Sequence, residues 1–226
     1  MSLRHTVRLT GHRGHRIISA PSVEPVTVAD LATFLRISGA SENDVLADCI
    51  SEARLMIENR IGVAMIDQSW LLTLDAWPAG GVRQWDGVVQ GPRDMMRMNP
   101  SLIDVEMPRW PLSSITSINV YDEDGNATAV TVADVFDTDT NSIPGRLSLK
   151  SGASWPVALR SNNAIEITYV AGYGAAAAAV PDDLKRAVKN LAGALYATRG
   201  DGCGDDELFA KAGINSVLSS YKVWRV

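Results

Sequence analysis

The sequence predicts an α+β fold: a helical bundle (two N-terminal helices, one long and one short C-terminal helix) with an inserted small antiparallel β subdomain. Apolar residues recur at helical spacing near both ends of the chain. The middle holds short runs of β-branched and aromatic residues separated by turn residues. The expected divisions are a basic arm and linker over 1–25, a helical hairpin over 26–66, the β subdomain over 67–174, C-terminal helices over 175–221 and a tail over 222–226.

The chain of 226 residues has an ordinary globular composition, with 46% hydrophobic and 21% charged residues and a net charge of −5. Its first 17 residues hold all three histidines, no acidic residue and four arginines, Arg4, Arg8, Arg13 and Arg16. The rest carries −9, from 17 basic and 26 acidic residues, which disfavours wrapping around nucleic acid. The basic arm is expected either to contact an acidic partner or DNA, or to be a solvated terminus.

Neither a membrane span nor a disulfide framework is expected. The longest uncharged apolar run, Tyr169–Val180, has 12 residues, too few to cross a bilayer. Arg or His interrupts the N-terminus every few residues, so it lacks the apolar core of a secretory signal. Cys49 and Cys203 are the only cysteines, which makes a reducing cytoplasm the default.

The N-terminal hairpin is predicted to begin at Thr27, an N-cap candidate with Asp30 three residues on. The apolar face of this first helix consists of Leu31, Phe34 and Leu35. We expect it to end at Gly39. A second helix over about 42–60, closed by Gly62, has a clean helical stripe. That stripe consists of Val45, Leu46, Cys49, Ile50, Ala53, Met56, Ile57 and Ile61.

Short strands are expected in the β subdomain. They are residues 68–77, 102–108, a hairpin over 114–132 that turns at Asp124-Gly125, 145–150 and 164–170. Strands this short and closely spaced indicate a compact antiparallel sheet or a small barrel. Around Gly80–Ser101, about twenty residues show no consistent period, and a loop of that length is usually functional or mobile.

Three of the six tryptophans, Trp77, Trp110 and Trp155, precede a proline. Proline favours extended geometry in the residue before it, so we expect these indoles at strand ends, where they cap the core. The alternative is a carbohydrate-binding platform, which needs exposed, coplanar rings.

Gly172-Tyr173-Gly174 is predicted to be the corner between the last strand and the long C-terminal helix. A phosphate cradle would need the glycines to lead directly into the helix, but a seven-residue gap follows them. Pro181 suits the first turn of that helix, and Arg199-Gly200 closes it. Its stripe is Leu184, Ala187, Val188, Leu191, Ala192 and Leu195. Residues 201–213 then read as a flexible acidic connector with at most one helical turn, before a short final helix.

Candidates for catalysis are few, and we expect no catalytic site, metal or cofactor. No histidine follows His15, which removes most Ser-His and Cys-His arrangements from the folded body. A metal-dependent hydrolase that uses Asp104, Glu106 or Asp122 is kept as an alternative, because Asp104 and Glu106 alternate onto one strand face. The segment that starts at Asp122 departs from the calcium-loop pattern, so a polar hairpin turn is expected there.

The order of the segments resembles the head–tail connector, or adaptor, proteins of long-tailed bacteriophages and of phage-derived gene transfer agents. These segments span about residues 26–226 and include VTVADLATFLRI, ENDVLADCISEARLMIENRIG, QSWLLTLDAWP, VEMPRWPLSSITSINVYDEDG, GRLSLKSGASWP, AIEITYVAGYG, VPDDLKRAVKNLAGALYATRG and YKVWRV. The resemblance implies a structural protein with no enzymatic residues. It implies rings, commonly of twelve subunits, beneath the portal in the neck of a virion or phage-like particle assembled in the host cytoplasm.

The partners that the resemblance implies are further copies in the ring, a portal protein and a tail-side connector or stopper, with DNA passing through the centre without sequence-specific binding. It places the portal contact at the C-terminal helix and tail, with the candidates Tyr221, Lys222, Val223, Trp224, Arg225 and Val226. In the long loop, Trp85, Met95, Met96 and Met98 are candidates for a subunit or tail interface, because methionine adapts to irregular surfaces. The alternative is that loop and tail fold back on their own subunit. The long loop and the basic arm depart from the family pattern.

Overall fold

The computed structural model describes residues 13–77, 104–158, 160–199 and 204–222. The chain divides into two compact units. The sheet unit draws on Met1–Ile18, Trp70–Pro108 and Ser114–Tyr169, and the helical unit on Ser19–Ser69, Arg109–Ser113 and Val170–Val226. Helices and antiparallel strands together confirm the α+β class. In the part of the chain that the structure describes, no helix has the length and apolar character needed to cross a membrane.

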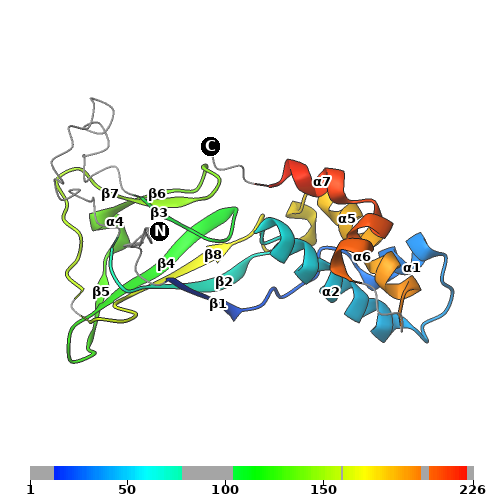
Figure 1. Ribbon diagram of the computed structural model, residues 1–226, viewed down its shortest axis with the longest axis horizontal. Coiled ribbons are helices and arrows are strands. Elements are labelled where there is room, and N and C mark those ends of the chain that lie inside the picture. Colours follow the sequence, from blue (N-terminus) through cyan, green and yellow to red (C-terminus); the bar gives the residue numbers. More distant parts are fainter. Residues whose placement is uncertain (1–12, 78–103, 159, 200–203, 223–226) are drawn as a thin grey trace, which may run out of the picture. The chain divides into compact units, whose positions relative to one another are not determined.

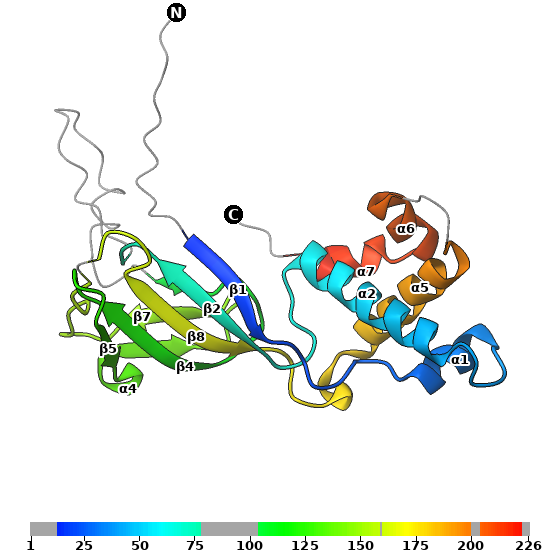
Figure 2. The same cartoon turned by 90° about the horizontal axis from the view of Figure 1, so that it is seen from below.

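The sheet unit contains two sheets (Figures 1 and 2). The larger, in spatial order, consists of β1 (Arg13–Ser19), β2 (Gln68–Leu74), β8 (Ile165–Ala171), β4 (Leu112–Tyr121) and β5 (Ala127–Val130). The smaller consists of β3 (Val105–Glu106), β7 (Arg146–Leu149) and β6 (Phe136–Asp139), with the short helix α4 (Val132–Val135) before β6. The pairs β4–β5, β3–β7 and β6–β7 are antiparallel.

The smaller sheet lies over one face of the larger one (Figures 1 and 2). Strand β8 alternates between buried and partly exposed residues, as expected of a strand with one face on a core. Fully buried side chains come from both sheets, among them Leu72 and Ile167 from the larger and Leu147 from the smaller. The period-2 pattern of the sequence therefore identifies the inward face of β8.

The helical unit consists of α1 (Val28–Leu35), α2 (Asn43–Ile61), α5 (Asp182–Ala197), α6 (Asp205–Ala212) and α7 (Asn215–Ser220), with a short 3-10 helix at Ala177–Ala179 (Figure 2). Helix α5 is central, because it contacts α1, α2, α6 and α7. Its predicted stripe is confirmed, with Leu184, Ala187, Val188, Leu191 and Ala192 buried. The N-cap at Thr27 is confirmed by a hydrogen bond of 3.1 Å from the Asp30 amide to the Thr27 hydroxyl.

Three helix predictions need correction. Helix α1 ends at Leu35, before the predicted Gly39, because Arg36 adopts the left-handed conformation with a φ of 59° and caps the helix. Phe34 and Val45, assigned to the buried faces of α1 and α2, are 50% and 39% exposed. The acidic connector is in part the eight-residue helix α6, which begins with acidic residues, buries two apolar side chains and ends at a left-handed Gly213.

A buried carboxylate organises the helical unit. Glu58 on α2 is 3% exposed, and burial raises its pKa. Its Oε1 accepts hydrogen bonds from the Met65 amide and from Gln68 Nε2, both at 2.8 Å. Its Oε2 accepts one from Arg54 Nη1 at 2.9 Å, and Arg54 Nε donates to Glu24 at 2.7 Å. These hydrogen bonds join α2 to Glu24, which precedes the helix in the sequence, and to Met65 and Gln68, which follow it.

The glycines at 172 and 174 form the predicted corner. The Gly172 amide donates to the Pro111 carbonyl at 2.9 Å, and the Asp67 amide donates to the Gly174 carbonyl at 3.1 Å. A Cβ atom at position 172 would lie 2.5 Å from the backbone nitrogen of Asp67, closer than real contacts allow. Glycine is therefore required at 172 by the close approach of a second backbone segment.

We predict that Glu58→Ala lowers the free energy of unfolding of the helical unit by roughly 3–5 kcal/mol, because the Met65 amide and Gln68 Nε2 lose their buried acceptor and Arg54 keeps Glu24 as its one carboxylate partner. Denaturant unfolding followed by helical circular dichroism measures this change. Glu52→Ala, an exposed position on the same helix, should stay within about 0.5 kcal/mol of the parent. Equal losses in the two variants would contradict the assigned role of Glu58.

We predict that Gly172→Ala destabilises the helical unit by about 1–3 kcal/mol, because the added methyl group overlaps the Asp67 backbone. Gly204→Ser is the control, since a Cβ there meets no heavy atom within 4 Å, φ is an ordinary −75°, and serine, like glycine, is a favoured N-cap. That control should change the free energy of unfolding by less than about 0.5 kcal/mol. Thermal melts of the two variants side by side test the difference.

Candidate interaction surfaces

Strand β1 forms one edge of the larger sheet, and all seven of its residues are exposed. His15 anchors it: the imidazole stacks on Trp70 with 4.5 Å between ring centroids and 9° between ring planes. His15 Nε2 lies 2.8 Å from the hydroxyl of Tyr169, a residue that is fully buried. Ile17 and Ile18 are 42% and 54% exposed. The edge strand is therefore held by its pairing with β2 and by the His15 ring, and it presents two isoleucines at the surface.

Residues 13–19 thus differ from the basic arm and linker that the sequence predicts. Two of the four candidate arginines lie in β1. Arg13 Nη2 donates to the Glu106 carbonyl at 3.0 Å, so this side chain contacts β3. Arg16 lines a pocket beside the strand. The signal that was missed is the pair of β-branched residues at 17 and 18, which is too short to predict a strand without knowledge of its partner.

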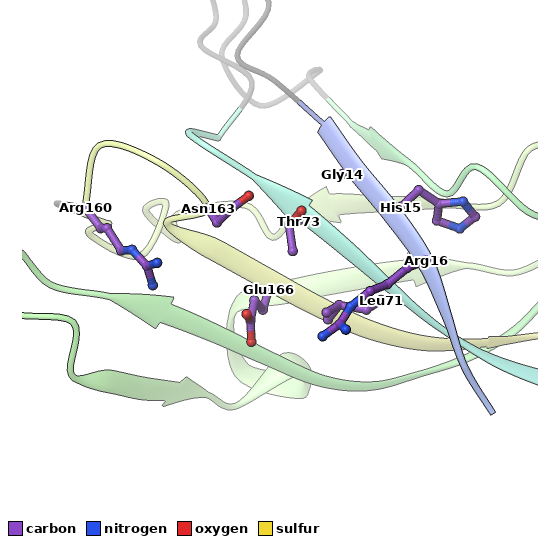
Figure 3. Close-up of a pocket in the computed structure, with 8 residues that line it drawn as sticks. All are labelled: Gly14, His15, Arg16, Leu71, Thr73, Arg160, Asn163 and Glu166. Carbon is purple, nitrogen blue, oxygen red and sulfur yellow. The ribbon is translucent and has the colours of Figure 1, made fainter.

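The pocket has a volume of about 290 Å³ and lies beside β1 on the larger sheet (Figure 3). It is on the face opposite the buried one, since its lining residue Glu166 alternates with buried neighbours in β8. In Figure 3, Arg16 and Arg160 approach from opposite sides, with Glu166 between them. Thr73 and Asn163 add a hydroxyl and an amide. These groups can bind a carboxylate or another anion.

Neighbouring side chains orient the charges of this pocket. The guanidinium of Arg160 lies over the ring of Tyr121, 5.3 Å from its centroid. The Tyr121 hydroxyl donates to Glu166 Oε2 at 2.7 Å, and this hydrogen bond raises the pKa of Tyr121. Among the lining residues, the one histidine already stacks on Trp70 and contacts Tyr169. The lining of this pocket is therefore better suited to binding a ligand than to transferring a proton to or from one.

Of the residues considered for a hydrolase, Asp104 and Asp122 have carboxylates that are engaged in other contacts. Asp104 accepts hydrogen bonds from Arg146 Nη1 at 3.0 Å and from the Ser148 hydroxyl at 2.7 Å. Arg146 Nε also donates to Asp139 at 3.0 Å, and this bond lowers the pKa of Asp139. Glu106 contributes its carbonyl to Arg13. Within the described residues, no group of three or more His, Cys, Asp and Glu side chains could hold a metal ion.

The acidic segment at 122–126 is the predicted hairpin turn between β4 and β5. Asp122 accepts hydrogen bonds from the Asn126 amide at 2.8 Å and from Asn126 Nδ2 at 3.0 Å, which together lower its pKa. The strands then pair in register, with Tyr121 opposite Ala127. The side chain of Asp122 thus closes the turn by binding Asn126 at its far end.

The tryptophans that precede proline pack against other side chains of their own unit. Trp77 stacks on Trp155 with 4.8 Å between centroids and tilts against Phe136 at 5.4 Å. Its Nε1 donates to the Pro156 carbonyl at 2.8 Å. Trp110 is 5% exposed. The packing interpretation is confirmed for these rings, which share contacts instead of presenting coplanar faces.

The start of the C-terminal segment is anchored in the helical unit. The Tyr221 hydroxyl donates to both carboxylate oxygens of Asp183, at 2.7 and 2.8 Å, and the ring stacks on Trp110 at 6.4 Å. Burial, together with this hydrogen bond, raises the pKa of Tyr221. Lys222 follows as an exposed residue. Tyr221 thus packs on its own subunit and fixes the point from which residues 222–226 continue.

The other candidate residues lie outside the part of the chain that the structure describes. They are Arg4 and Arg8 of the arm, Trp85, Met95, Met96 and Met98 of the long loop, and Val223, Trp224, Arg225 and Val226 of the tail. The predicted interface roles of these residues stay predictions.

The chain shares its fold with chains of a phage-like particle. It aligns with a chain from the neck of an empty gene transfer agent particle, computed with C6 symmetry, with a TM-score of 0.69, 22% identity and coverage of 94% of this chain and 97% of that one. A chain from the virion of a native gene transfer agent particle aligns with a TM-score of 0.68 and 23% identity, over 94% of this chain and 96% of that one. A chain from the neck of a native particle, computed with C12 symmetry, aligns with a TM-score of 0.63 and 22% identity, over 93% of this chain and 97% of that one. No family model and no curated protein matches the sequence. The comparisons therefore establish a common fold over nearly the full length of both chains.

Proposed function

We propose that this protein is a structural head–tail adaptor of a phage or phage-like particle. In this role, twelve copies form a ring beneath the portal in the particle neck. The ring joins the DNA-filled head to the tail through a portal protein on one side and a connector or stopper on the other. DNA passes through the centre without sequence-specific binding, and the particle is assembled in the host cytoplasm.

One observation carries this proposal: the fold is shared from end to end with chains of neck assemblies. The alignments cover 93–94% of this chain and 96–97% of the other chains. Two of those assemblies were computed with six-fold and twelve-fold symmetry. A ring of identical subunits requires a heterologous contact that closes by rotation.

The charge of the chain is compatible with a conduit. Residues after position 17 carry −9, and surplus carboxylates on a channel wall repel DNA phosphate and prevent it from sticking. A non-enzymatic role also accords with the carboxylates of the β subdomain, because Asp104 and Asp139 share Arg146.

The C-terminal segment is the proposed portal contact. Tyr221 holds the end of α7 through Asp183 and Trp110, so residues 222–226 start from a fixed point on the bundle. Of the residues that follow, Trp224 and Arg225 belong to the types that most often dominate binding energy in interfaces, and Val223 and Val226 add apolar surface beside them.

We predict that deletion of residues 222–226 leaves the fold intact, because Tyr221 and its contacts are retained, but abolishes attachment to the portal. Co-sedimentation of the purified chain with portal rings measures attachment, and circular dichroism checks the fold. A chain that lacks residues 2–6 is the length-matched control and should bind as the parent does. Undiminished binding of the C-terminally truncated chain would refute the docking role.

A further inference from the structure

We propose that neighbouring copies in the ring join edge to edge through the larger sheet, with β1 of one copy beside β5 of the next. This inference rests on the proposed function, since it names the subunit contact of that ring. The two strands are the opposite ends of the strand order β1-β2-β8-β4-β5. Within the described residues, each of them has a hydrogen-bonded neighbour on one side alone.

Both edges are open and suited to pairing. All residues of β1 are exposed, and so are Ala127, Thr128 and Ala129 of β5. An unpaired edge is a template for another strand, and proteins usually protect it with proline, lysine or a charged side chain. Strand β5 holds none of these, and its small side chains permit a close approach. At roughly 3.3 Å per residue, β5 spans about 13 Å and β1 about 23 Å, so β1 can cover β5 completely.

The residues of β1 are basic in charge, whereas the residues that flank β5 in the sequence are acidic. Strand β1 brings Arg13, His15 and Arg16 and no acidic residue. The chain from 122 to 136, which contains β5, holds Asp122, Glu123, Asp124 and Asp134 and no basic residue. Arg16 also lines the pocket in which Arg160 is the second guanidinium. Complementary charge of this kind favours the contact between β1 and β5 over contacts between two like edges.

The geometry yields a heterologous contact. Because β1 and β5 are different surfaces on opposite sides of one sheet, each copy uses β1 toward one neighbour and β5 toward the other. Such a head-to-tail contact generates a closed ring when its rotation closes. A contact between two β1 edges would instead stop at a dimer.

Engineered cysteines test the pairing. In a Cys203→Ser background, which retains the buried Cys49, Ile17→Cys is combined in one chain with Ala127→Cys, Thr128→Cys or Ala129→Cys. Scanning three positions covers the register, since paired strands lie about 4.7–4.9 Å apart and disulfides form over that range. Assembled particles are oxidised mildly and analysed on denaturing gels. We expect a ladder of covalent multimers from at least one pair, and single monomer bands from each cysteine alone.

The control pair is Ile17→Cys with Val157→Cys, a residue of the sheet unit that is 72% exposed and lies outside β5. If none of the three test pairs gives more covalent multimer than this control in particles that show rings by electron microscopy, the edge-to-edge contact is wrong while the proposed function stands. If Ile17→Cys alone gives dimers, like edges meet and the proposal is overturned. If no ring is found, both the contact and the proposed function fail.

Charge reversal gives a second readout. Arg16→Glu should lower the yield of rings several-fold at low salt and less at high salt, because the attraction to the acidic segment of the next copy is screened. Arg186→Glu, an exposed arginine on α5 of the helical unit, is the matched control and should leave the yield unchanged. An equal effect of the two substitutions would contradict the assigned contact.

Discussion

The carboxylate of Glu58 connects segments of the helical unit that are distant in the sequence. It accepts hydrogen bonds from Arg54 on its own helix and from Met65 and Gln68 in the segment that follows. The carbonyl of the same residue accepts from Arg109 at 2.6 Å. A buried charge persists only where such partners satisfy it, so replacing any one of them exposes the others to the cost of burial. The segments before β2 and before β4 are therefore both fixed to helix α2.

This arrangement gives the C-terminal segment a firm base. Trp110 follows Arg109, its amide donates to Gly62 at 3.4 Å, and its carbonyl accepts from Ala64 at 2.8 Å. The indole of Trp110 stacks on the ring of Tyr221. A chain of contacts thus leads from the buried carboxylate to the residue from which the tail continues. In the proposed adaptor role, the helix that carries residues 222–226 would already be ordered before a partner binds.

Elements with strong local signals could be predicted from the sequence. Helix α2 has an uninterrupted stripe and a left-handed Gly62, and α5 has acidic residues in its first turn and a stripe of apolar residues. Strand β1 could not, because an edge strand is defined by its pairing with β2 and by the contact of His15 with Trp70, neither of which is local. The pocket lining likewise comes from β1, β2 and the region around β8, so no single stretch of the sequence predicts the pocket. The division into two sheets also depends on long-range pairing, as with Asp104 and Arg146, 42 residues apart.

The central claim is that identical copies of this chain form a closed ring at the neck of a particle. An electron cryomicroscopy map of purified particles, with this chain fitted to the density, addresses it most directly. The account predicts density for the sheet and helical units in a closed ring of identical copies between portal and tail. Particles whose neck density is fully accounted for by other chains, with this protein recovered only in the unassembled fraction, would contradict it.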